Sequence, residues 1–90
     1  MNASPAATVR SGRTSLSYKE TRELAALPAR IESLEEEQKR YQAEMSMPDF
    51  FKRPADEIRA SQARMAELAE TLAAEMARWE FLMDKDAGAA

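Results

Sequence analysis

The segment Met47-Pro48-Asp49-Phe50-Phe51-Lys52-Arg53-Pro54 lies between two long stretches that are rich in charged residues, and it decides how the chain folds. Its two prolines lack the amide hydrogen that a helix interior requires, and each disfavours helical angles in the residue before it. The two flanking stretches therefore cannot form one continuous helix, and the chain must turn here. A chain that turns back on itself needs apolar stripes of similar period on both sides of the turn.

The composition is typical of long helices. The chain has 90 residues, which is the size of one small domain, and it is rich in Ala, Glu, Leu, Arg and Met, with two glycines. It contains no cysteine and no histidine, and it has no glycine-rich phosphate loop. Nucleophilic triads, zinc sites and nucleotide cradles all need some of these parts. We therefore expect these residues to form no enzyme and to hold no metal or cofactor.

The stretch before the turn has a helical start signal and a seam of heptad spacing. Ser17 and Glu20 have the spacing of a capping box, so we expect a helix to begin near Tyr18. Pro28 predicts a break or bend between a short helix at about 18–27 and a helix at about 28–46. The expected seam consists of Leu27, Ile31, Leu34, Gln38, Tyr41 and Met45.

The stretch after the turn repeats this period. Pro54 suits the first turn of a helix that we expect to span about 54–83. Its seam is predicted to be Ile58, Gln62, Met65, Ala69, Leu72, Met76, Trp79 and Met83, broadened by Leu68 and Leu82. Two seams of equal period on either side of a turn predict an all-α fold, a two-stranded antiparallel coiled-coil hairpin.

Folding the second helix against the first pairs residues whose numbers add up to about 103. Trp79 then packs on Leu24 and Leu27, and Phe50 or Phe51 closes the hairpin over the last turn of the first helix. The predicted core is Leu24, Leu27, Ile31, Leu34, Tyr41, Met45, Phe50, Ile58, Met65, Leu68, Leu72, Met76 and Trp79. We interpret Gln38 and Gln62 as polar seam members that fix the register. Heptads do not distinguish this hairpin from a helix-swapped dimer, and we favour the monomer.

The ends of the chain differ from the hairpin, which is predicted to span residues 16–83 with its turn at 47–54. Residues 1–15 hold arginines and no acidic residue, which predicts a disordered basic arm, and residues 84–90 are expected to fray. No segment resembles a secretory signal or a membrane span, so we expect a cytoplasmic protein.

The basic residues are the candidate nucleic-acid contacts, because clustered cations bind phosphates. One group lies in the arm and at the open end of the hairpin, and another lies toward the turn. The candidates are Arg10, Arg13, Lys19, Arg22, Lys39, Arg40, Lys52, Arg53 and Arg59. Phe50 and Phe51 could add stacking on unpaired bases. The alternative is that these cations only solubilise the rod, as we also interpret Arg64 and Arg78, because nearby carboxylates nearly cancel the charge at the turn.

Several short motifs resemble one family. They are Leu16-Ser17-Tyr18-Lys19, Arg22-Glu23-Leu24, Leu27-Pro28, Ile31-Glu32, Leu34-Glu35, Pro48-Asp49-Phe50-Phe51 and Arg78-Trp79-Glu80. In this order they look like the carboxy-terminal domain of bacterial ABC-F ATPases of the Uup type. The resemblance implies an antiparallel coiled coil attached to nucleotide-binding cassettes, which would hold ATP and Mg²⁺ in a longer parent chain.

The resemblance also implies a function without catalysis. It suggests a DNA-binding accessory domain that makes sequence-nonspecific contacts to phosphates, with branched DNA among its targets. The alternatives are an element of the same ATPase that docks on the ribosome or its RNA, and a structural or protein-interaction coiled coil. Because an aromatic residue at the turn belongs to the family's pattern, the resemblance favours a packing role for it over base stacking.

Overall fold

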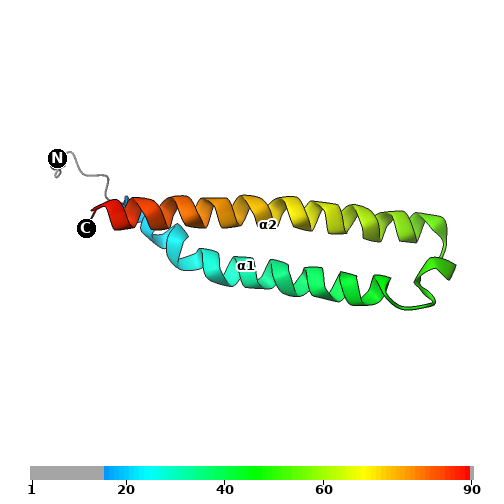
Figure 1. Ribbon diagram of the computed structural model, residues 1–90. Coiled ribbons are helices and arrows are strands. Elements are labelled where there is room, and N and C mark those ends of the chain that lie inside the picture. The colour runs from blue at the N-terminus through cyan, green and yellow to red at the C-terminus, as the bar shows by residue number, and fades with distance from the viewer. Residues whose placement is uncertain (1–15, 90) are drawn as a thin grey trace.

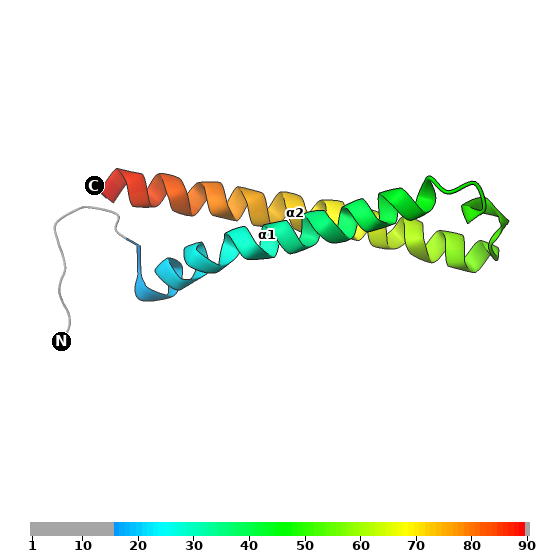
Figure 2. The ribbon, with the colours of Figure 1, turned by 90° about the horizontal axis from the view of Figure 1, so that it is seen from below.

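Two long antiparallel helices form the molecule. The structure is a computed structural model that describes residues 16–89. Helix α1 spans Tyr18–Met45, a short 3-10 helix η1 spans Phe50–Lys52, and helix α2 spans Ala55–Ala89. The two long helices run side by side from the open end to the turn (Figure 1). In the view turned by 90°, one helix crosses over the other at a small angle (Figure 2). The predicted all-α hairpin is confirmed, as a rod of 63 × 22 × 16 Å.

Helix α1 begins at the predicted capping box. The Glu20 amide donates to Ser17 Oγ at 3.0 Å, and the Ser17 amide donates to Glu20 Oε1 at 2.9 Å. The two residues thereby satisfy two donors that the first turn of a helix leaves without partners. Hydrogen bonds between neighbouring residues thus define where α1 begins.

The predicted separation of two helices at Pro28 is wrong, because α1 is one helix with Pro28 inside it. The proline removes one backbone hydrogen bond, and its ring crowds the carbonyl of Leu24, which bends a helix without ending it. The bend is visible in the cyan part of α1 (Figure 1). Pro28 is exposed while Leu27 is completely buried, so the proline ring lies on the outer face of α1. Packing on the inner face holds the two halves of the helix together.

The inner face of α1 follows the predicted seam. Leu27 is fully buried, and the side chains that follow it on this face are half-buried. These half-buried members are Ile31, Leu34, Gln38, Tyr41 and Met45. A thin two-helix core leaves most seam residues partly exposed, since each side chain is covered from one direction. Leu24, another predicted core residue, is half-buried as well.

The inner face of α2 differs from the predicted seam at every second position. Ile58, Met65, Leu72 and Trp79 lie inward as predicted, but Gln62, Ala69, Met76 and Met83 are exposed. The inward positions are the residues just before them: Leu68 and Leu82, which were predicted to broaden the seam, and Ser61 and Glu75, which were not predicted. Leu68 is 1% and Leu82 0% exposed, whereas Met76 is 41% exposed and is wrongly placed in the predicted core. The predicted register role of Gln62 is wrong for the same reason.

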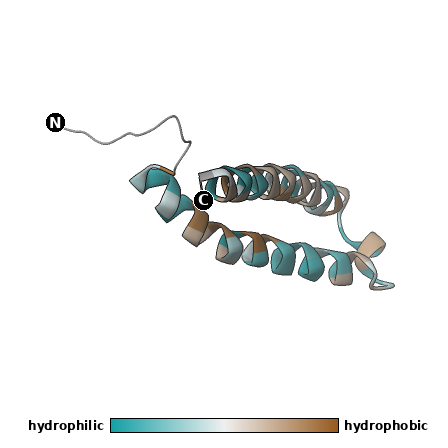
Figure 3. Cartoon of the chain, turned by 60° about the vertical axis from the view of Figure 1, so that its left-hand side comes forward, coloured by the Kyte–Doolittle hydropathy of each residue, from teal (hydrophilic) through white to brown (hydrophobic). Residues whose placement is uncertain are grey.

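The turn is closed by Phe50. Helix α1 ends at Met45, and η1 follows, held by backbone hydrogen bonds from Phe50 to Met47 and from Arg53 to Phe50. Phe50 is fully buried, which confirms that one of the two aromatic residues closes the hairpin, while Phe51 remains 65% exposed. In Figure 3 the hydropathy colouring alternates along both long helices, and the short helix at the turn is brown.

The predicted frayed tail is also wrong over the described residues, because α2 continues to Ala89. Lys85 anchors this last part to the start of α1 through an ion pair with Glu20. In the described part of the chain, no helix combines the length and the apolar character that a membrane crossing requires.

Candidate nucleic-acid interface

Two arginines of α2 are held by glutamates of α1. Arg78 donates to both carboxylate oxygens of Glu23, through Nε at 2.7 Å and Nη2 at 2.8 Å. Arg64 does the same to Glu37, through Nε at 2.9 Å and Nη2 at 3.0 Å. Such two-point pairs fix the geometry of both side chains. Arg64 and Arg78 therefore join the helices, which corrects their interpretation as merely solubilising charges.

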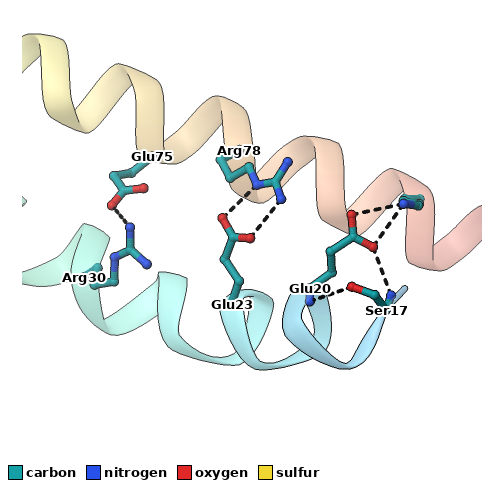
Figure 4. Close-up of polar contacts among 7 residues, drawn as sticks. Ser17, Glu20, Glu23, Arg30, Glu75 and Arg78 are labelled. Carbon is teal, nitrogen blue, oxygen red and sulfur yellow. Dashed lines mark hydrogen bonds and ion pairs between the residues drawn. The ribbon is translucent and has the colours of Figure 1, made fainter. Parts of the chain in front are cut away.

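Two further ion pairs cross between the helices. Lys85 Nζ lies 3.0 Å from Glu20 Oε1, and Arg30 pairs with Glu75 (Figure 4). In each of the four cross-helix pairs the residue numbers add up to a value close to 103. The predicted antiparallel register is thus confirmed by contacts that flank the apolar seam on both sides.

The ion pairs shift the titration of their members. The Arg78 guanidinium lowers the pKa of Glu23, and the Arg64 guanidinium lowers the pKa of Glu37, in each case chiefly through its hydrogen bonds. The pKa of Glu20 is lowered first by the backbone amide of Ser17 and then by Lys85. The same contacts raise the pKa values of Arg64 and Arg78. These glutamates and arginines therefore stay charged at neutral pH and keep their partners within the fold.

Most of the predicted nucleic-acid contacts belong to a different class of cations. Within residues 16–89, the exposed basic residues that form no ion pair are Lys19, Arg22, Lys39, Arg40 and Arg59. Arg22 contacts an aromatic side chain instead, with its guanidinium carbon 5.8 Å from the centre of the Tyr18 ring. A cation without a carboxylate partner can bind a phosphate without first breaking a contact of the fold.

The structure groups these unpaired cations at two places. Lys19 and Arg22 lie in the first turns of α1, at the open end, and Lys39 and Arg40 lie in its second half. The register places Arg59 of α2 near the level of Glu44, about one helical turn from Arg40 along the rod. Arg10 and Arg13 lie outside the described residues.

Lys52 and Arg53, the two predicted contacts at the turn, have carboxylate partners. Lys52 Nζ lies 3.6 Å from Asp49, and both side chains are at least 80% exposed. Arg53 pairs with Glu44 at 3.2 Å and lies over the Phe50 ring, 5.3 Å from its centre. The Lys52 pair is a weak surface contact that solvent screens, so Lys52 remains available. Arg53 contributes to closing the hairpin.

A shallow hollow of about 520 Å³ lies on α1 beside the unpaired Arg40. Its lining residues are Glu37, Arg40, Tyr41, Ala43 and Glu44. Two of the three charged groups in it are carboxylates, so it does not have the charge of a phosphate pocket. Residues 16–89 bring together no group of three acidic side chains that could hold a metal ion.

Comparison with models of known protein families identifies the family of the chain. The family model for the ABC transporter C-terminal domain matches residues 15–84, which includes nearly the whole hairpin. The chain belongs to this family. The resemblance to the carboxy-terminal domain of Uup-type ATPases is confirmed by the similar proteins described next.

Two bacterial relatives are named Uup or Uup-like. The ATP-binding protein Uup of Escherichia coli strain K12 is 35% identical over 80 residues, which are 89% of this chain and 13% of the relative. The ATP-binding protein Uup-like of Haemophilus influenzae is 40% identical over 70 residues, or 78% of this chain and 15% of the relative. The chain therefore spans a small part of the length of the relatives that it matches.

A solved structure has the same fold. It is described as the C-terminal domain of the Uup protein, a DNA-binding coiled coil motif, and it superposes with a TM-score of 0.78 at 33% identity. The match covers 87% of this chain and 91% of the other. The family is described as a C-terminal domain and this neighbour as a coiled coil, which agrees with the prediction that these residues form no enzyme.

Proposed function

We propose that this hairpin is a DNA-binding accessory domain of an ABC-F ATPase and that it contacts phosphates without reading the base sequence. The observation that carries the proposal is the likeness, over nearly the whole hairpin, to a coiled coil described as DNA-binding. The charge pattern supports it, because the cations that the fold leaves unpaired lie on outward faces. ATP and Mg²⁺ belong, on this proposal, to other parts of a longer cytoplasmic parent chain.

The unpaired cations of α1 suggest how a phosphate backbone would lie. In a straight helix the 18 residues from Arg22 to Arg40 would make five full turns and place both on one face about 27 Å apart, and the bend at Pro28 shortens this distance. Exposed small residues, among them Ala26, Ala29 and Ser33, lie between them on that face and allow close approach. Glu36 also lies on this face and opposes binding. Such a surface would bind phosphates over a length somewhat shorter than one turn of duplex DNA, which is about 34 Å.

Fluorescence anisotropy with a labelled duplex tests the proposal. We expect log K to fall linearly with log salt concentration and to change little with base sequence. Substituting Lys39 and Arg40 together by Gln should weaken binding and make the salt slope shallower by about 1 per lost phosphate contact. Absence of binding to duplex, branched and single-stranded DNA at low salt would refute the proposed function.

A charge-matched control separates local contacts from net charge. The double substitution Arg30→Gln and Lys85→Gln also removes two positive charges, but it takes them from residues that are paired within the fold. It should weaken DNA binding less than the Lys39 and Arg40 substitutions do. Equal losses would indicate that only the net charge matters. Competition with ribosomal RNA and with branched DNA then ranks the targets within the same electrostatic mechanism.

A protein-interaction role is a second candidate, supported by one observation. Two exposed apolar side chains, Met76 and Met83, lie two helical turns apart on one face of the last half of α2, and they are 41% and 43% exposed. Single exposed apolar residues are ordinary, but a group on one element is typical of contact surfaces. Replacing Met76 and Met83 by Gln should leave DNA affinity unchanged and weaken association with the rest of the parent protein, as a pull-down would measure.

A further inference from the structure

The two adjacent phenylalanines of the turn have opposite environments. Phe50 is completely buried, whereas Phe51 is 65% exposed. The sequence leaves undecided which of them closes the hairpin, and the structure assigns that task to Phe50 alone. Phe51 is therefore an apolar ring at the end of the rod whose position the closing of the turn does not explain.

The exposed ring is held in a fixed position. Phe51 lies in the 3-10 helix η1, and its ring meets the Phe50 ring edge to face, with centres 5.0 Å apart and planes at 89°. Phe50 is in turn covered by Arg53 at 5.3 Å, and Arg53 is paired with Glu44. A ring supported in this way loses little conformational entropy when a flat partner stacks on it.

The surroundings of the ring favour a partner that is both flat and anionic. Lys52 follows Phe51 directly, its side chain is 80% exposed, and its Asp49 contact at 3.6 Å is a weak surface pair. An unpaired nucleotide offers a base that stacks on an aromatic ring and a phosphate that a flexible lysine reaches. A paired base in a duplex offers no free face to the ring.

From this arrangement we infer that Phe51 is a stacking platform for an unpaired DNA base and that Lys52 binds a neighbouring phosphate. The inference rests on the proposed function, which it extends from phosphates to bases at one end of the rod. The narrow end, on a rod of 63 × 22 × 16 Å, can approach an unpaired base from its open side. The tip would then prefer single-stranded DNA, while the faces of the rod bind any phosphate backbone.

The test compares a labelled single strand with the duplex of the same sequence, using the full 90-residue chain. Phe51→Ala should weaken single-strand binding about tenfold and change duplex binding less than twofold. Phe51→Trp should keep the single-strand affinity. A 2-aminopurine base in the strand should lose fluorescence on binding the natural chain and lose less on binding Phe51→Ala. Phe81→Ala is the matched control, since Phe81 is 53% exposed and lies near the other end of the rod.

Circular dichroism of each variant shows whether the hairpin is folded. Should Phe51→Ala fail to fold, Phe51→Leu keeps an apolar side chain without an aromatic face and is expected to show the same selective loss. Unchanged single-strand binding, or an equal loss for both DNA forms, would overturn the inference while leaving the proposed function standing. If the natural chain bound neither form at low salt, the proposed function and the inference would fail together.

Discussion

At the scale of single residues, Phe50 and Phe51 provide a direct comparison of burial. Phe50→Ala removes a fully buried ring that closes the hairpin, so it should lower the free energy of unfolding by about 3–5 kcal/mol. Phe51→Ala removes a mostly exposed ring and should cost less than about 1 kcal/mol. Urea unfolding followed by circular dichroism measures both. Equal costs would contradict the assignment of Phe50 as the closing residue.

The inner face of α2 is tested by a second pair of residues. Leu68 is 1% exposed and Met76 is 41% exposed, although heptad spacing alone fits Met76 to the seam. We expect Leu68→Ala to cost about 2–5 kcal/mol of stability and Met76→Ala less than about 1 kcal/mol. Thermal or urea unfolding of the two variants ranks them. A larger loss for Met76→Ala would restore the seam that spacing predicts.

At the scale of the helices, the seam of α1 could be predicted from the sequence and that of α2 only in part. After Ile58 the next inward residue lies three or four positions later, and Ser61 and Glu75 have polar side chains that argue against burial. The spacing fits Gln62 as well as Ser61, and neither of these is apolar, whereas at the later position it fits the apolar Met76 better than Glu75. Glu75 lies inward because Arg30 of the other helix pairs with it, and that partner belongs to tertiary structure, which spacing within one helix does not reveal.

The basic residues of the candidate site also divide into those whose role could be predicted from the sequence and those whose role could not. The exposed cations without partners could be predicted from their clustering in the sequence, since solvated charge needs no tertiary contact. The roles of Arg64 and Arg78 could not, because their partners Glu37 and Glu23 lie on the other helix. The predicted register, in which paired residue numbers add up to about 103, could have identified these pairs. It brings each arginine to within a few residues of its glutamate on the other helix. The bend at Pro28 depends similarly on packing that outweighs a local preference.

The ion pairs between the helices predict a loss of stability in acid. The pKa values of Glu20, Glu23 and Glu37 are lowered from an ordinary value of 4.5, so the unfolded chain binds protons more readily than the folded one. Their contribution is therefore complete above about pH 4.5 and is lost as the pH falls through the lower folded values. Tm measured between pH 7 and pH 2 should change little down to about pH 4.5 and decrease below it.

A charge-exchange experiment isolates one of these pairs. Glu37→Gln should lower Tm at pH 7 and flatten its decrease in acid, since the carboxylate is then absent in both states. Exchanging the partners, with Glu37→Arg and Arg64→Glu together, should recover part of the Tm that either reversal loses alone. A decrease in acid that is equally steep in Glu37→Gln would mean that this pair does not contribute to it.

At the scale of the whole molecule, the turn decides whether the chain closes on itself or exchanges helices with a second copy. In a swapped dimer that joins α1 and α2 into one rod, residues 46–54 would have to become helical through Pro48 and Pro54. Proline at both positions disfavours such a helix, and straightening the turn would expose Phe50, which is fully buried in the hairpin. The geometry of the turn thus favours the monomer that the sequence predicts.

Light scattering coupled to gel filtration tests this preference. We expect a mass near 10.1 kDa that does not change with protein concentration over about two orders of magnitude. Replacing Pro48 and Pro54 together by Ala removes the main obstacle to a continuous helix, so a fraction of dimer should then form and grow with concentration. Phe51→Ala, which alters the turn without changing its prolines, should remain monomeric. A natural chain that doubles in mass as its concentration rises would show instead that the hairpin opens, and that the ion pairs and apolar contacts between α1 and α2 form between two copies.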